Sequence, residues 1–316
     1  IELGCSVVGV VSQPDRPRGR GRQLQPTPVA RCARDHALPL FQWPRLNQES
    51  FDVLSSLKPD IAVVIAYGKI LPQRYLDLPR LGCLNVHGSL LPALRGAAPI
   101  QWSVIRGHQE TGITIMRMDA GMDTGDIGLQ VATDIDPMET SGDLHDRLAP
   151  IGALALADAL RLVCDGTISY RPQDHSRSTV APRLSKVNGL INWSRTANDV
   201  HNHVRGMAPW PGAYVNHSSG PLKVHQTRPV AASGIPGVVI DITSEGPVVA
   251  CGDGAVVITR IQRPGRRAAA AGRVDFHKAA LGTEIAGRCG RRAHVRATVA
   301  RLRDHPPHGR KLAVQR

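Results

Sequence analysis

An amide and an imidazole lie two residues apart in the segment NVHGSLLP, residues 85–92, directly after an apolar run. A primary amide such as that of Asn85 can donate a hydrogen bond to a developing oxyanion, and His87 can transfer protons near neutral pH. The turn MDAGMDTGD, residues 118–126, adds carboxylates that can orient an imidazole and favour its charged form. These groups are typical of acyl transfer to an amine, which needs no nucleophile from the enzyme because the amine itself attacks.

A second group of residues is suited to binding a polyanion. Four arginines lie within seven residues of a loop near the N-terminus, namely Arg16, Arg18, Arg20 and Arg22. The 316 residues carry a formal net charge of +13, and residues 260–316 hold 15 Lys and Arg against 3 Asp and Glu. This excess predicts binding to nucleic acid that weakens strongly with salt. The alternative for the arginines is a solvated face.

Several elements of the first half must position these residues. Short, nearly continuous apolar runs occur at residues 7–12, 60–68, 81–89 and 112–118, and such runs are typical of strands buried on both faces. Helices are expected at residues 28–36 and 98–106, and from a cap at 140–141 to residue 164, with a bend at Pro150. The pattern predicts an α/β fold, a Rossmann-like, doubly wound, mostly parallel sheet. Polar residues that follow its strands face a crevice.

The second half has a different pattern. Residues 170–187 are polar and aperiodic and are expected to form a linker, followed by a helix at residues 196–205. Short strand candidates then lie at 213–215, 237–242, 246–254 and 255–262, a spacing that predicts a small β-barrel of the OB-like kind. The expected domains are therefore a catalytic unit at 1–169, the linker, a barrel-like unit at 188–288 and a basic tail at 289–316. A disordered, solvated tail is an equal alternative for the last segment.

Composition excludes several classes of protein. The six cysteines form no CxxC pair or Cys/His cluster, which argues against a disulfide framework and a zinc site, and no metal is expected. No run of eighteen apolar residues and no signal segment occurs, so we expect a cytoplasmic protein that does not span a membrane. We also expect a monomer.

Taken in order, these segments resemble the folate-dependent formyltransferase family, and within it the branch that acts on methionyl-tRNA. The resemblance rests on NVHGSLLP, on RGAAPIQ at residues 95–101, on the DTGD turn, and on PWPGAY at residues 209–214. It implies formyl transfer from 10-formyltetrahydrofolate to the α-amine of methionyl-initiator tRNA, a step in translation initiation. The long arginine loop and the basic second unit favour tRNA over a small nucleotide as acceptor.

The resemblance also implies roles for individual residues. The family's catalytic Asn, His and Asp fall on Asn85, His87 and Asp123. Contact with the formyl-folate is implied for Ser89, Leu90, Leu91 and Pro92, and contact with tRNA for Arg16, Arg18, Arg20 and Arg22.

The family's first strand and helix have no counterpart ahead of residue 7. Because that strand is central in a doubly wound sheet, we expect unpaired edges on its two neighbours, and weak folding or activity of residues 1–316 alone. Two alternative functions stay open. One is another formyl-folate-dependent formyltransferase or hydrolase, and the other is an inactive relative that binds tRNA without releasing tetrahydrofolate.

Overall fold

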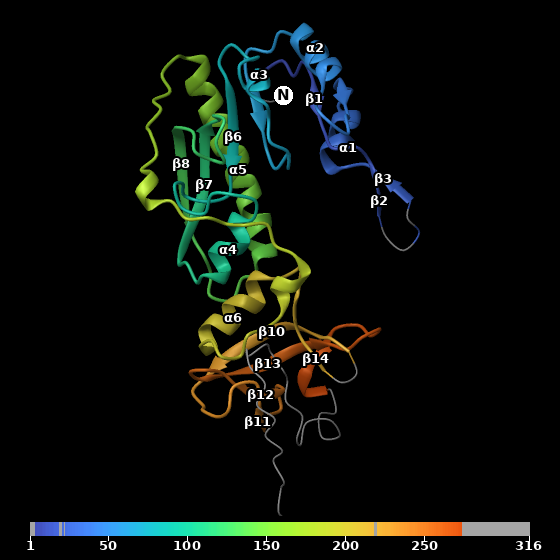
Figure 1. The fold of residues 1–316 in the computed structure, drawn as a ribbon, viewed down its shortest axis with the longest axis vertical. Helices are drawn as coiled ribbons and strands as arrows, with labels where there is room; N and C mark the ends of the chain where they lie inside the picture. The colour runs from blue at the N-terminus through green and yellow to red at the C-terminus, as the bar shows by residue number, and fades with distance from the viewer. Residues whose placement is uncertain (1–3, 19–20, 22, 218–219, 274–316) are drawn as a thin grey trace, which may run out of the picture.

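The computed structural model describes residues 4–18, 21, 23–217 and 220–273. Figure 1 shows an α/β unit above a β-rich unit, with helix α6 (Ala197–Gly206) at their junction. Among the described residues, no helix is both long and apolar enough to cross a membrane.

The α/β unit contains three separate sheets, one of which is a two-stranded hairpin near the N-terminus. β1 (Val10–Val11) pairs in parallel with β4 (Leu40–Phe41), and four further strands form a sheet in the order β5-β6-β7-β8. These four strands are β5 (Ala62–Val64), β6 (Cys83–His87), β7 (Glu110–Arg117) and β8 (Ile127–Asp134). β5 and β6 are parallel, whereas β6–β7 and β7–β8 are antiparallel.

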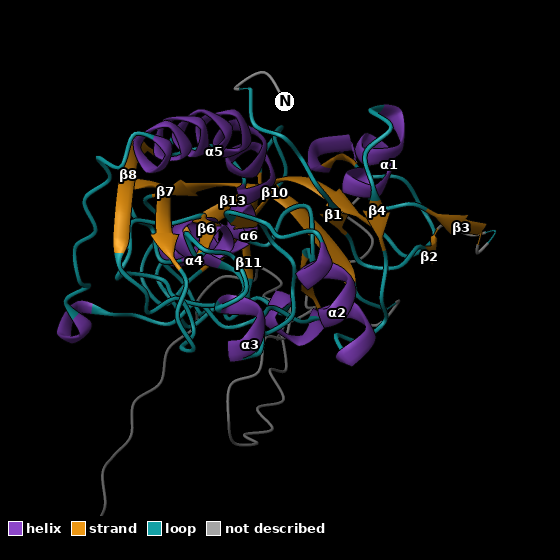
Figure 2. Ribbon diagram, turned by 90° about the horizontal axis from the view of Figure 1, so that it is seen from above, coloured by secondary structure: helices purple, strands orange, loops and turns teal. Residues whose placement is uncertain are grey.

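The prediction of a mostly parallel sheet was therefore wrong. β7 has six buried residues in succession because both of its faces are covered, and this burial produces the apolar run that suggested a parallel strand. Helix α5 (Ser141–Cys164) covers one face of the sheet, as Figure 2 shows. On the other face, Leu91 of the loop after β6 packs against Met116 of β7. The short turn between β7 and β8 makes that pair an antiparallel hairpin.

Two strands of the α/β unit each have one edge without a ladder among the described residues. Within the described residues, β1 pairs only with β4 and β5 only with β6. Val63 on β5 is 40% exposed, and Ile65 just beyond it is 57% exposed.

Local sequence signals explain the helices of this unit. The remaining helices are α1 (Pro28–Asp35), α2 (Gln48–Ser56), α3 (Gln73–Leu76) and α4 (Pro99–Ile105). Thr27 caps α1, and Thr140 caps α5 in a capping box with Asp143. α5 continues through Pro150, and its Leu144 and Leu148 pack against the sheet.

The second unit is an antiparallel sheet that packs on α6. Its strands are β9 (Ala213–Val215), β10 (Leu222–Val230), β11 (Val239–Ile242), β12 (Pro247–Ala250), β13 (Ala255–Gln262) and β14 (Ala269–Ala270). The order is β11-β12-β13-β10-β9, with β14 also paired to β13. No ladder among the described residues joins β11 to β9, so the closed barrel is not confirmed.

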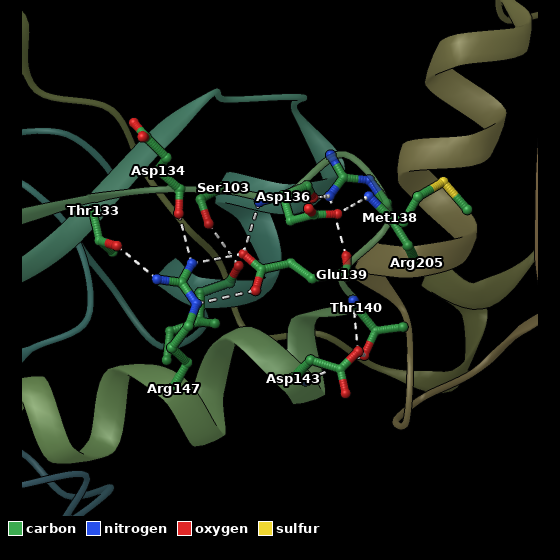
Figure 3. A network of polar contacts seen from close by, with 11 residues as sticks. Ser103, Thr133, Asp134, Asp136, Met138, Glu139, Thr140, Asp143, Arg147 and Arg205 are labelled. Atoms are coloured by element: carbon green, nitrogen blue, oxygen red, sulfur yellow. Dashed lines mark hydrogen bonds and ion pairs between the residues drawn. The ribbon is translucent and has the colours of Figure 1, made fainter.

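A polar network joins the two units, and Figure 3 shows it from close by. Arg205 of α6 donates to the carbonyl oxygens of Asp136 and Glu139, both at 3.2 Å. The Glu139 carboxylate in turn accepts from Arg147 of α5 at 2.8 Å. The turn between β8 and α5 is thus held from both sides.

Candidate active site

The alternation of β6 places Asn85 and His87 on one face of the sheet. Residues i and i+2 of a strand share a face, while Leu84 and Val86 point to the opposite face and join the core under α5. Asn85 is paired with Val64 on β5 and Met116 on β7, so it lies inside the sheet, not at an edge. Its side chain is half-buried and has no hydrogen-bond partner among the described residues. The amide is therefore available to a ligand.

His87 is 5% exposed and has an acceptor near each ring nitrogen. Its Nε2 lies 3.0 Å from the carbonyl oxygen of Leu94, and its Nδ1 lies 3.7 Å from Oδ2 of Asp123. Because a carbonyl oxygen only accepts, Nε2 carries a proton, and Nδ1 faces a carboxylate. The structure thus brings the predicted His and Asp together at ion-pair distance.

Asp123 reaches the histidine from the turn between β7 and β8. Its backbone has φ +55°, in the left-handed region that Asp tolerates better than most residues. Its Oδ2 accepts from the backbone N–H of Gly96 at 2.8 Å, which fixes the carboxylate beside the loop after β6. The side chain is 18% exposed, so this ion pair is only weakly screened by solvent.

The four residues expected to contact the folate form the loop that follows β6. Ser89 and Leu91 are buried; the Ser89 hydroxyl donates to the carbonyl oxygen of Ala93 at 2.6 Å. Leu90 and Pro92 are half-buried and have surface available to a ligand. The Leu91–Pro92 peptide bond is cis. Folate contact by this loop stays a prediction.

Thr114 on β7 holds this loop and was not predicted from the sequence. Its hydroxyl donates to the carbonyl oxygen of Ser89 at 2.6 Å and accepts from the N–H of Leu91 at 3.1 Å. The side chain is fully buried opposite His87. A lone threonine within the apolar run GITIMRM is the signal that could have identified it.

The arginine loop forms a hairpin of β2 (Arg16–Arg18) and β3 (Gln23–Gln25). Figures 1 and 2 both show it extending away from β6, β7 and β8. Arg16 is exposed on this hairpin, Arg18 ends β2, and Arg20 and Arg22 lie outside the described residues. Contact of these four arginines with tRNA stays a prediction.

The buried cysteines near the sheets are not reactive groups. Burial raises the pKa of the Cys83 thiol to about 11, and burial likewise raises that of Cys251 to about 11. Both are neutral thiols at physiological pH, and neither is suited to act as a nucleophile. Among the residues that the structure describes, no group of three His, Cys, Asp or Glu side chains could hold a metal ion.

Comparison with known proteins identifies the family. The model of the formyl transferase family matches residues 2–160, and that of the formyl transferase C-terminal domain matches residues 183–275. The chain belongs to the formyl transferase family. It is 46% identical over 277 residues to the methionyl-tRNA formyltransferase of Citrifermentans bemidjiense, covering 87% of this chain and 86% of that one. It is 45% identical to the enzyme of the same name from Geobacter sulfurreducens, with 84% of each chain covered.

Solved structures of other formyltransferases share the fold at low sequence identity. An N-formyltransferase from Helicobacter canadensis, in complex with folinic acid and dTDP-3-aminofucose, matches with a TM-score of 0.61 at 16% identity, covering 80% of this chain and 98% of that one. HypX from Aquifex aeolicus, in complex with tetrahydrofolic acid, matches with a TM-score of 0.56 at 18% identity, covering 78% of this chain and 44% of that one. These matches show the Rossmann-like α/β fold of the first unit within a formyltransferase architecture.

Proposed function

We propose that this protein transfers the formyl group of 10-formyltetrahydrofolate to the α-amine of methionyl-initiator tRNA. The observation that carries the proposal is the buried His87, held between the Asp123 carboxylate and the Leu94 carbonyl on the same strand face as the unpaired amide of Asn85. The curated relatives at 45–46% identity are named for this reaction.

In the proposed mechanism the amine of the methionyl group attacks the formyl carbon. The Asn85 amide donates to the oxyanion of the tetrahedral intermediate, and the positive charge of His87 stabilises it. Asp123 orients His87 and assists transfer of the amine proton to N10 of the folate. The bond between carbon and N10 then breaks, which leaves tetrahydrofolate and N-formylmethionyl-tRNA.

Two features support tRNA as the acceptor. The β2–β3 hairpin contributes exposed positive charge, and residues 260–316 carry most of the net charge of the chain. The proposal includes a catalytic unit at residues 1–169, a linker at 170–187, a barrel-like unit at 188–288 and a basic tail at 289–316. It also includes that the protein is a cytoplasmic monomer. Light scattering of the purified chain would test the oligomeric state.

Replacement of Asn85 by Ala tests the mechanism. Removal of one oxyanion donor costs about 10² to 10³ in kcat, so we expect a loss on that scale in formyl transfer to charged initiator tRNA. The affinity for tRNA should change less than about twofold, because the lost interaction exists only in the transition state. Asn198→Ala is the matched control, since that amide is exposed on α6.

The same assay separates the alternatives. Binding of tRNA by the unaltered chain without release of tetrahydrofolate would identify an inactive relative. Formyl transfer to a small amine or to water, with none to tRNA, would identify another formyl-folate enzyme. Unchanged turnover of Asn85→Ala would refute the role of the amide.

A further inference from the structure

Arg95 is a buried cation held by the segment expected to be a linker. Its side chain is 8% exposed, and its Nε and Nη2 donate to Oε1 of Gln173 at 3.1 and 2.6 Å. Nη2 also lies 3.1 Å from Nδ1 of His175. No carboxylate of the described residues forms an ion pair with Arg95, so these neutral acceptors must replace its hydration.

The other end of the Gln173 amide holds the turn that carries Asp123. Nε2 of Gln173 donates to the carbonyl oxygens of Asp123 at 3.0 Å and Gly125 at 2.7 Å. Gln173 is 5% exposed, so water does not compete for these bonds. One buried side chain therefore accepts from the loop after β6 and donates to the turn after β7.

These two backbone segments contain the groups that orient His87. The carbonyl oxygen of Leu94 accepts from Nε2 of His87, and the N–H of Gly96 donates to the Asp123 carboxylate. Arg95 lies between them, so its bonds to Gln173 set the distance between the loop and the turn.

A second residue of the same segment fixes the loop. Thr179 accepts from the N–H of Leu94 through its hydroxyl at 2.9 Å and from the N–H of Arg95 through its carbonyl at 2.8 Å. Asp123 itself has a positive φ, a conformation that persists only where neighbouring groups hold it.

We propose that Gln173 is a positioning residue that holds Asp123 against His87 and thereby sets the rate of formyl transfer. Gln173 moves no proton and touches no reacting atom. Its kinetic effect rests on the proposed function, whereas its effect on the site geometry does not.

Replacement of Gln173 by Glu tests the proposal at nearly constant size. The introduced carboxylate still accepts from Arg95, but it cannot donate to the carbonyl oxygens of Asp123 and Gly125 and repels them. We expect the Gly96 N–H to exchange with solvent about tenfold faster or more, because its acceptor moves with the turn. Two backbone N–H groups should keep their protection from exchange. That of Arg95 donates to the carbonyl oxygen of Thr179, and that of Ala181 donates to the carbonyl oxygen of Arg95. A shift of the carboxylate by about 1 Å costs on the order of 10²-fold, so kcat should fall about 10- to 100-fold.

Two further measurements separate positioning from general stability. The KM for 10-formyltetrahydrofolate should change less than about twofold, since the lost contacts act on the catalytic step. Gln173→Met should also speed exchange at Gly96, because it removes both the donor to the turn and the acceptor of Arg95 without adding a charge. Ser176→Ala is the control, as that hydroxyl donates to Asp174 on the exposed side of the same segment and has no other partner among the residues that the structure describes.

The exchange measurement decides the proposal even if the unaltered chain transfers no formyl group. Unchanged protection at Gly96 in Gln173→Glu would overturn it. So would global unfolding of both variants, which would make Gln173 a general stability residue. If the unaltered chain is active, faster exchange with unchanged kcat would overturn the kinetic part alone. Absence of transfer by the unaltered chain would contradict the proposed function and leave the exchange result to stand.

Discussion

Two buried histidines differ in the polar groups that face their ring nitrogens. In the candidate site, Nε2 of His87 faces the carbonyl oxygen of Leu94 and Nδ1 faces the carboxylate of Asp123. His201 of α6 lies 3.2 Å from the carbonyl oxygen of Pro137 and 3.1 Å from the hydroxyl of Thr227, which can donate. One acceptor and one donor match the neutral ring. Burial lowers the pKa of His201, and the nearby charge of Arg205 lowers it further.

This lowered pKa predicts a stability that depends on pH. The unfolded chain takes up the proton near pH 6.5, before the folded protein does. Stability is therefore complete above that pH and decreases as the pH falls below it. We expect the melting temperature to decrease between pH 7.5 and 5.5, and His201→Gln to reduce that decrease by roughly 2–4 °C. His145→Gln is the control, since that ring is exposed. An equal decrease in all three proteins would contradict the assignment.

At the scale of elements, the junction between α5, α6 and the turn after β8 depends on one buried guanidinium. Arg205 is 7% exposed and also donates to Oδ1 of Asn202 at 2.9 Å. Burial lowers its pKa, but the two backbone acceptors of the turn keep it a hydrogen-bonded cation.

Replacement of Arg205 by Met should destabilise the protein by about 1.5–3 kcal/mol, because it removes the charged donor from the carbonyl oxygens of Asp136 and Glu139. The control is Arg195→Met just ahead of α6. Arg195 forms an exposed ion pair with Asp199, so this change should cost less than about 1 kcal/mol. Urea denaturation of both variants measures the difference, and equal losses would rule out a special role for Arg205.

Elements with strong local signals could be predicted from the sequence. α1, α5 and α6 lie where helices were expected, and α5 begins at the expected cap of Thr140. The strand that contains Asn85 and His87 lies where its apolar run indicates. β8 and β10 were not predicted, because their mixed burial breaks the apolar pattern. The prediction that the strands of the α/β unit run mostly parallel was wrong for a related reason, because burial on both faces of a strand does not specify whether it runs parallel or antiparallel to its neighbours.

The same limit applies to the candidate site. The pairing of His87 with Asp123 was predicted from the resemblance and is present at 3.7 Å. The contacts of Gln173 were not predicted, because they join a polar, aperiodic segment to residues 48–78 positions earlier in the chain. Local pattern carries no information on such pairs, and composition alone had marked residues 170–187 as a linker.

For the whole molecule, the distribution of charge predicts how tRNA binding responds to salt. Each phosphate contact contributes about one unit to the slope of log affinity against log salt concentration. We expect the double replacement of Arg20 and Arg22 by Ala to weaken tRNA binding and to reduce this slope by roughly one to two units. Arg80→Ala is the control, since Arg80 is paired with Asp60 on the surface. A slope that does not change would exclude the loop from the tRNA interface.

The bonds from Gln173, Thr179 and Ala181 to the site have a consequence for the order in which a ribosome completes this protein. Asp123 and His87 leave the ribosome well before the residues that hold them in place. Residue 181 follows residue 123 by 58 positions (181 − 123), which at about 5–20 residues per second takes roughly 3–12 s. During that interval the nascent chain contains the residues of the candidate site without their final geometry, which is completed only when residues 173–181 fold back onto it.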